Sequence, residues 1–140
     1  MHRAGFPVPP PRREIKWNTT ARLITDACRV PLGATVHYRS RSPFVVELAL
    51  HTPSGEVVWR LDRDMLLAGT EAPTGLGEVH IRPAPYEQVV LRLGDPSHAA
   101  LISLDRHHVL RWVTTSHSMV PVGTESSHID WQPFLDVLAG

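Results

Sequence analysis

The chain has 140 residues, 42% apolar and 20% charged, a balance typical of one globular domain with its own core and not of a disordered chain. Fourteen basic side chains offset fourteen acidic ones, which argues against a chain dominated by the positive charge that attracts nucleic acids or anionic membranes. A single cysteine, Cys28, excludes an internal disulfide, and no apolar run approaches the ~18 residues of a membrane span. We therefore expect a soluble, cytosolic domain in a reducing compartment.

The first sixteen residues are rich in proline. They include Pro7, Pro9, Pro10 and Pro11. Proline favours the extended polyproline II conformation, and the segment lacks the apolar stretch of a secretory signal. We expect residues 1–16 to form a tail, either a loose arm or a proline-rich docking peptide, and residues 17–140 to form the domain. Trp17 lies at the join, where its ring is a candidate anchor for a partner.

Two strands are predicted before residue 40. Residues Asn18–Val30 are rich in Thr, Ile, Leu and Val with partial alternation, which favours a strand. We expect the segment Pro31–Gly33 to end it, because proline donates no ladder hydrogen bond and glycine suits a turn. The same pattern places Cys28 within the strand as a small buried side chain. A short strand over Thr35–Arg39 follows.

The clearest pattern is a hairpin. Apolar and polar residues alternate over Phe44–Thr52 and again over Val57–Leu61, with the turn sequence Thr52–Gly55 between them. The expected apolar face of the first strand carries Phe44, Val46, Leu48 and Leu50. We expect Trp59 to lie on the matching face of the second strand, in the core.

A short helix and a loop are predicted next. Asp62 is a plausible N-cap, Met65, Leu66 and Leu67 supply a buried side, and Gly69 is expected in the left-handed conformation at the C-terminus. Residues 73–77 are expected to form a loop. The glycines at positions 75 and 77 precede a strand and not a helix, so they do not form a phosphate-binding loop.

Three further strands and two helices complete the prediction. The strands are Glu78–Arg82, Glu87–Leu93 and Ala99–Leu104, separated by proline- and glycine-rich turns. Asp105 can cap a helix that runs to about Ser116 and buries Trp112. A last helix starts at Asp130 and carries an apolar stripe, which we also expect in the core. The stripe comprises Trp131, Phe134, Leu135 and Leu138. Hairpin-length turns favour antiparallel pairing, so we predict an α+β fold with about seven strands, a short internal helix and two main C-terminal helices.

No catalytic or metal site is predicted. His107 and His108 are adjacent, so on a helix they diverge, and no metal-binding spacing of histidines or cysteines occurs around His117 or His128. The sequence also lacks a nucleophile elbow, and Asp62 with Asp64 is more simply a helix start than a catalytic pair. We therefore expect a protein that is not an enzyme and uses no metal or cofactor.

Nucleic-acid binding is the rival hypothesis. Several arginines flank a loop or lie at outward strand positions, where they could line a path for a single strand. These arginines are Arg22, Arg39, Arg41, Arg60, Arg82 and Arg92. Acidic residues share the same outward faces, so cross-strand ion pairs explain the mixture equally well. These acidic residues are Asp26, Glu47, Glu56 and Glu78. We favour the ion pairs and treat nucleic-acid binding as the alternative.

The order of residues in Val57–Gly69 and Pro73–Val79 closely resembles the SsgA/SsgB-like family of actinobacterial sporulation and cell-division proteins. That family has a tryptophan strand, an Arg-Asp-Leu-Leu helix and a Pro-x-Gly-x-Gly-Asp-Val turn into a strand. The matching signature positions are Trp59, Arg63, Asp64, Leu66, Leu67, Gly69, Pro73, Gly75, Gly77 and Val79. The resemblance extends over roughly Thr19 to Leu138. Met65 and Glu78 depart from the pattern, and so do His107, His108 and the Trp112 helix.

The resemblance implies a whirly-like fold, a homotrimer and a non-enzymatic adaptor role in septum placement and cell-wall remodelling. It implies FtsZ-type division proteins, other family members and cell-wall machinery as partners, and recruitment from the cytoplasm to division septa. No catalytic residue carries over from the family. The partner-binding residues are unknown at this stage, because the signature positions are structural ones. The alternative function is a whirly-like regulator that binds single-stranded nucleic acid.

Overall fold

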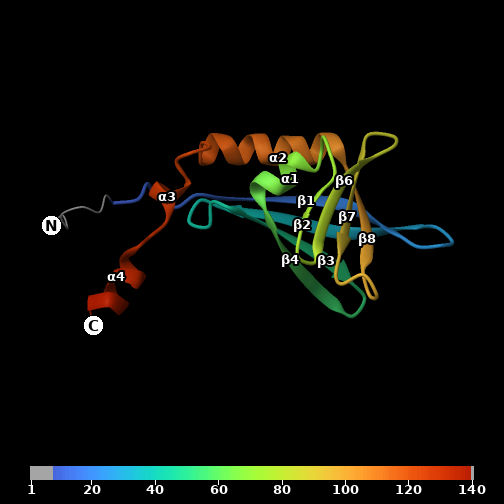
Figure 1. Ribbon diagram of the computed structural model, residues 1–140, viewed down its shortest axis with the longest axis horizontal. Coiled ribbons are helices and arrows are strands. Elements are labelled where there is room, and N and C mark those ends of the chain that lie inside the picture. Colours follow the sequence, from blue (N-terminus) through green and yellow to red (C-terminus); the bar gives the residue numbers. More distant parts are fainter. Residues whose placement is uncertain (1–7, 140) are drawn as a thin grey trace.

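The computed structural model describes residues 8–139, which fold into an antiparallel eight-stranded sheet with four helices (Figure 1). The strands are β1 (Glu14–Ile24), β2 (Arg29–Arg39), β3 (Val45–Thr52), β4 (Gly55–Asp62), β5 (Thr74–Leu76), β6 (Val79–Ala84), β7 (Gln88–Leu93) and β8 (Ala100–Asp105). The helices are α1 (Arg63–Ala68), α2 (Arg106–Met119), α3 (Glu125–His128) and α4 (Gln132–Ala139). The predicted α+β class with antiparallel pairing is confirmed.

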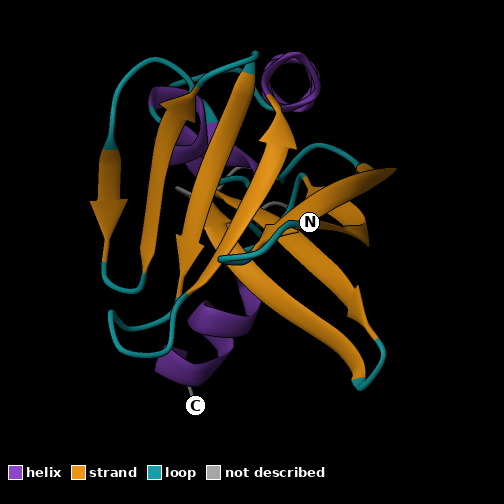
Figure 2. Cartoon of the chain, turned by 90° about the vertical axis from the view of Figure 1, so that its right-hand side faces the viewer, coloured by secondary structure: helices purple, strands orange, loops and turns teal. Residues whose placement is uncertain are grey.

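The sheet has the strand order β4-β3-β2-β1-β8-β7-β6-β5 and bends into two wings (Figure 2). Alternate residues of each strand point to its inner face, where they form one apolar core with α1 and α2. Trp112 of α2 is 5% exposed and lies 6.3 Å from the ring of Trp17 on β1. The predicted core position of Trp112 is therefore confirmed, and Trp17 packs partly against the same core.

The first hairpin differs from the prediction. The chain turns back after Ile24, and Pro31, Leu32 and Gly33 lie inside β2 instead of ending a strand. Thr25 and Cys28 exchange hydrogen bonds across the turn, so alternation leaves Pro31 in a non-hydrogen-bonded pair with β1. The backbone nitrogen of Pro31, which carries no hydrogen, therefore points towards the β3 side of β2. β3 pairs with β2 only from Gly33 onward, so no hydrogen bond is lost at Pro31. The turn also places Cys28 on the surface and not in the core.

The N-terminal strand begins earlier than expected. β1 starts at Glu14, within the segment predicted as a tail, and Ser40 N–H donates to the Arg13 carbonyl at 2.8 Å just beyond it. Residues 8–13 form neither strand nor helix. Pro7, part of the expected polyproline stretch, lies outside the described residues.

The second hairpin is confirmed. β3 and β4 pair from Val45 opposite Asp62 to Thr52 opposite Gly55, as the turn sequence predicted. Val46, Leu48 and Leu50 are at most 5% exposed. Phe44 is an exception, because it lies in the turn before β3 and is 43% exposed.

Helix α1 has the predicted cap but a different C-terminus. Asp62 accepts a hydrogen bond from Met65 N–H at 2.9 Å. Gly69 is in the right-handed region with φ −66°, so the expected left-handed conformation is wrong. A Cβ at this position would lie 2.2 Å from Ile81 Cγ2 on β6. Glycine is needed here for close packing and not for its conformational freedom.

The loop predicted over residues 73–77 contains a strand that the sequence did not predict, in addition to the seven expected. Thr74–Leu76 forms β5, which pairs with β6 at the edge of the sheet. Gly77 makes the turn between the two strands with φ +60°, a conformation that favours glycine. Sequence patterns missed this strand because three residues show no measurable alternation.

The C-terminal helices depart most from the prediction. α2 is capped by Asp105 as expected but continues to Met119. α3 was not predicted. α4 contains no buried residue, and Trp131 is 42% exposed, so the expected burial of its stripe is wrong. The reason is geometric: α2 already covers that part of the core, and α4 stands apart at one end of the molecule (Figure 1). Among the described helices, none has the length and apolar character that crossing a membrane requires.

Candidate functional site

The inner face of the sheet is not fully covered by its own helices. Beyond the N-terminal end of α2, strands β1, β2, β3, β4 and β8 line an open apolar groove of about 630 Å³. The lining residues follow the core residues on the same face of each strand, two positions further along. They lead from Leu48 to Leu50 on β3, from Leu61 to Trp59 on β4 and from Leu104 to Ile102 on β8. The lining contains no lysine, arginine, aspartate or glutamate; His51 is its only ionisable side chain. Trp59, which was expected in the core, packs partly against the core and also lines the groove.

A second exposed apolar surface is the stripe on and beside α4. Trp131, Phe134 and Leu138 are 42%, 56% and 68% exposed, and Leu135 lies between them. Their spacing of i, i+3, i+4 and i+7 puts the four side chains on one face of the helix. The Trp131 ring meets that of Phe134 edge-on at 6.4 Å. Exposed apolar patches of this kind mark interaction surfaces.

A buried arginine connects α1 to the C-terminal segment. Arg63 is 1% exposed, and its Nη1 lies 2.9 Å from the Tyr38 hydroxyl, 3.2 Å from the Ser116 carbonyl and 2.8 Å from the Val120 carbonyl. Its Nη2 donates to Glu125 Oε2 at 3.3 Å. Glu125 in turn accepts from Gly123 N–H at 2.6 Å. We call this network the Arg63 clasp.

Three groups in or near the Arg63 clasp have shifted pKa values. Burial raises the pKa of Tyr38 to about 12, although the guanidinium of Arg63 acts in the opposite direction. The pKa of Glu125 is lowered by hydrogen bonds from the backbone N–H groups of Glu125 itself and of Gly123, and by the charge of Arg63. Burial first, and then repulsion by Arg63, lowers the pKa of His117. The role of this network is structural, since both charged partners are buried, Arg63 at 1% and Glu125 at 7% exposure.

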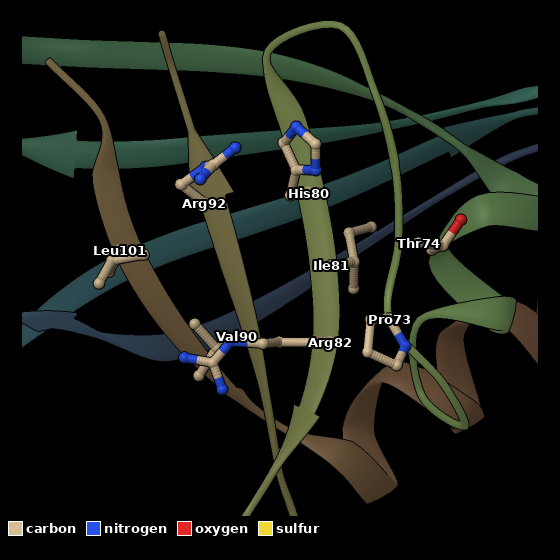
Figure 3. A pocket seen from close by; sticks show the side chains of 8 residues that line it. All are labelled: Pro73, Thr74, His80, Ile81, Arg82, Val90, Arg92 and Leu101. Atoms are coloured by element: carbon tan, nitrogen blue, oxygen red, sulfur yellow. The ribbon is translucent and has the colours of Figure 1, made fainter. Parts of the chain in front are cut away.

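The outer face of the part of the sheet formed by β5, β6, β7 and β8 carries a basic depression of about 550 Å³ (Figure 3). Arg82 on β6 lies opposite the buried Val90 of β7, and Arg92 lies two residues further along β7, opposite His80. Arg22 of β1 does not line the depression, but it lies in the same cross-strand row, opposite Ser103 of β8, which in turn lies opposite Val90. Among residues 8–139 none of these three arginines forms an ion pair, and Arg92 Nε is buried without a hydrogen-bond partner.

The remaining candidate arginines lie elsewhere. Arg39 forms an ion pair with Glu47 at 2.5 Å, and Arg60 lies opposite the same carboxylate in the β3–β4 register. Arg41 donates to the His128 carbonyl at 3.4 Å. The expected stripe of six arginines is therefore divided. Arg22, Arg92 and Arg82 lie on β1, β7 and β6, whereas the other three lie on β2, on β4 and in the turn after β2.

Most of the signature residues lie in or beside α1 and do not share one pocket; Trp59 lines the groove, and Pro73 lines the basic depression. Arg63, Leu66, Gly69 and Val79 are buried, Leu67 and Trp59 are partly buried, and Asp64, Pro73, Gly75 and Gly77 are exposed. They attach α1 to β6 and to the core. Sequence reasoning missed the roles of Tyr38 and Glu125, which lie 25 and 62 residues from Arg63; no local pattern connects residues so far apart. The described part of the chain contains no group of three or more histidine, cysteine, aspartate or glutamate side chains that could hold a metal ion.

Comparison with known proteins places this geometry in a family. The model of a family described as "Streptomyces sporulation and cell division protein, SsgA" matches residues 32–125. The sporulation-specific cell division protein SsgB of Frankia casuarinae is 36% identical over 83% of this chain and 84% of its own length. The SsgB of Kineococcus radiotolerans is 29% identical over 88% of this chain and 78% of its own.

Two solved structures have the same fold. An SsgA-like sporulation-specific cell division protein from Thermobifida fusca superimposes with a TM-score of 0.80 at 26% identity, over 90% of this chain and 96% of that one. A structure of SsgB from a study of longitudinal cell division during sporulation of Streptomyces coelicolor gives a TM-score of 0.78 at 26% identity, over 84% and 97% of the two chains. On the matches in sequence and in fold, this chain belongs to the SsgA family of sporulation and cell division proteins.

Proposed function

We propose that this protein is a non-enzymatic adaptor that acts in sporulation-specific cell division through protein–protein contacts. The observation that carries the proposal is the pair of exposed apolar surfaces, the groove on the inner face of the sheet and the stripe on α4. Apolar surface with an aromatic anchor such as Trp59 is where protein interfaces concentrate their binding energy. The family relationship supports a role in division, and it does not identify the partner.

We propose FtsZ-type division proteins and other members of the family as partners, and a homotrimer as the assembled state. In this proposal the protein is cytoplasmic and is recruited to septa, where it influences septum placement and cell-wall remodelling. The support is the resemblance of the sequence to proteins of this family. The groove is the surface that we assign to these contacts, because its lining is apolar and uncharged.

A pair of matched variants tests the proposal. Val57 lines the groove and is 45% exposed, whereas its neighbour Val58 points to the opposite face of β4 and is 49% exposed. Tagged wild-type protein, Val57→Lys and Val58→Lys are expressed in a sporulating actinobacterium that lacks the native gene. Each is made with and without residues 1–12, a deletion that stops before the Arg13–Ser40 hydrogen bonds and β1. We expect wild-type and Val58→Lys to localise to septa and to co-purify with division proteins, and Val57→Lys to lose both.

The tail deletion separates the tail from the domain as the partner-binding element. Co-purification that is lost only without residues 1–12 assigns the contact to the tail and removes the groove from it. A wild-type protein that neither localises to septa nor co-purifies with any division protein contradicts the adaptor role.

A second candidate function, binding of single-stranded nucleic acid, is favoured by Arg82 and Arg92, the two arginines that line the basic depression and form no ion pair among residues 8–139. Anisotropy of labelled single-stranded oligonucleotides tests it, with Arg82→Ala/Arg92→Ala against the control Arg39→Ala/Arg41→Ala. Phosphate contacts release counterions, so affinity should fall steeply with salt and be lost in the first variant only. Absence of binding at low salt dismisses this function.

A further inference from the structure

The basic depression on β6 and β7 combines positive charge that is not neutralised with an apolar floor. Arg82 and Arg92 line it and form no ion pair among residues 8–139. The side chain of Arg82 extends from β6 across β7 towards Val90, and Leu101 of β8 lies beside it (Figure 3). Arg92 Nε is buried and has no acceptor in the described part of the chain. A buried donor without an acceptor costs free energy, and a bound anion removes that cost.

The family signature helps to shape this depression. Gly75 on β5 lies opposite His80 on β6, and the imidazole rests directly on the glycine, since a Cβ at position 75 would overlap His80 Nδ1. A larger residue at position 75 would therefore displace His80, which lines the depression opposite Arg92. Pro73 and Thr74 line the depression as well. The segment that precedes β6 is thus part of a binding surface as well as a structural turn.

Cations recur across the strands at a regular distance. Arg82 lies opposite Val90 of β7, and Val90 lies opposite Ser103 of β8. Ser103 in turn lies opposite Arg22 of β1. Adjacent strands are ~4.8 Å apart, so three strand spacings separate Arg82 from Arg22 by about 14 Å. An extended peptide rises ~3.4 Å per residue and covers this distance in four residues, with its side chains i, i+2 and i+4 on one face.

We propose that the basic depression binds an extended acidic segment of a partner protein. The segment crosses the strands and carries two carboxylates four residues apart. One carboxylate pairs with Arg82 and Arg92, the other pairs with Arg22, and an apolar side chain midway between them packs on Val90 and Leu101. This inference deepens the proposed function, on which it rests for the idea that the chain acts through protein contacts. It gives the adaptor a second surface, so that one partner occupies the groove and another the depression.

The lining favours a peptide over a nucleic acid. Proteins that bind single strands combine a positive path with aromatic side chains on which the bases stack. No phenylalanine, tyrosine or tryptophan lines the depression, whose apolar residues are Pro73, Ile81, Val90 and Leu101. Such side chains accommodate an apolar side chain of a peptide and offer no platform for a base. The positive charge is also local, because the whole sequence has a net charge of zero, which suits a short acidic segment better than a long polyanion.

Isothermal titration calorimetry of the full chain with two synthetic peptides tests the spacing. The matching peptide is Gly-Glu-Ala-Leu-Ala-Glu-Gly with capped ends. The control Gly-Glu-Glu-Ala-Leu-Ala-Gly has the same composition and charge, but its carboxylates are adjacent. At low salt, where screening is weak, the matching peptide should bind roughly fivefold more tightly, because only its second carboxylate reaches Arg22. Arg22→Gln should weaken the matching peptide to the level of the control and leave the control unchanged.

A pair of double variants tests the site. Arg82→Gln/Arg92→Gln should weaken the matching peptide roughly tenfold or more, because it removes both charge-assisted hydrogen-bond donors of the depression. Arg60→Gln/Arg111→Gln removes the same charge from exposed arginines outside the depression and should retain the affinity of the wild type. Urea unfolding shows whether each variant is folded. The exposed Arg22 keeps the test decisive if the first double variant is not.

The outcomes separate this inference from the adaptor role and from nucleic-acid binding. Equal affinity for the two peptides overturns the inference, and so does an equal loss in the two double variants. A short oligothymidylate that binds more tightly than the matching peptide, and that is lost in Arg82→Gln/Arg92→Gln, assigns the depression to nucleic acid and also overturns it. In each of these cases the adaptor role stands if Val57→Lys still loses septal localisation. If the matching peptide binds as expected but no division protein co-purifies, the acidic-peptide site stands and the adaptor role falls.

Discussion

Replacing Arg63 by methionine tests the most consequential buried interaction in the fold. Methionine keeps much of the side-chain volume and removes the guanidinium, which contacts the Tyr38 hydroxyl, the Ser116 and Val120 carbonyls and the Glu125 carboxylate at 2.8–3.3 Å. The variant therefore removes a donor from four acceptors. The Glu125 carboxylate, which is 7% exposed, keeps only backbone donors such as Gly123 N–H and loses its buried counter-charge.

The expected loss of unfolding free energy is about 3–5 kcal/mol, the usual cost of breaking a buried ion pair by removing one partner. This is a large share of the ~5–15 kcal/mol by which a native domain is stable. At a denaturant dependence of about 2 kcal/mol per molar urea, the midpoint falls by roughly 2 M.

Urea unfolding followed by tryptophan fluorescence measures this loss, because Trp112 is buried and lies close to Trp17. Arg111→Met is the matched control, since Arg111 is exposed on α2, and its effect should stay within about 0.5 kcal/mol. The double variant Arg63→Met/Glu125→Gln should be more stable than Arg63→Met, because it removes the stranded carboxylate. A loss below about 1 kcal/mol for Arg63→Met would refute the reasoning, since a single ordinary hydrogen bond already contributes that much.

Three further predictions concern pH, packing and capping. Folding lowers the pKa of Glu125 from 4.5 and that of His117 from 6.5, so both groups contribute stability above these values and lose it as the pH falls through their lower pKa values in the folded protein. The urea midpoint should therefore fall on acidification, and it should fall less in Glu125→Gln. Gly69→Ala should cost about 1–3 kcal/mol by urea unfolding, because its Cβ would overlap Ile81; an unchanged midpoint contradicts this packing. Asp105→Ala should cost about 1 kcal/mol by the same assay, because the carboxylate caps α2, whereas Asp105→Asn should retain most of the stability.

Local patterns were sufficient where one residue acts on its near neighbours. The alternation over Val46–Leu50, the turn at Thr52–Gly55 and the caps at Asp62 and Asp105 were all predictable, because each depends on contacts within a few residues. The order of residues from Trp59 to Val79 identified the family, and the family match and the common fold confirm it.

Position in the sheet decided what the local patterns could not. A proline such as Pro31 ends a strand only where the strand has hydrogen-bonded neighbours on both edges. Here β2 pairs with β1 at Pro31 but not with β3. Gly69 has the composition of a left-handed cap, but the approach of Ile81 is the reason for a glycine. The arginine at position 39 and the one at position 82 look alike in sequence, yet only the second lies in the basic depression.

The sequence by itself determined the class of fold, the family and the amphipathic character of the last helix. Only the tertiary structure decided where apolar surface remains uncovered. The stripe from Trp131 to Leu138 predicts burial because apolar residues at helical spacing need a partner, but the pattern does not say which partner. α2 already covers the neighbouring core and the Arg63 clasp holds α4 apart, so the partner that the sequence predicted within the chain must be sought outside it.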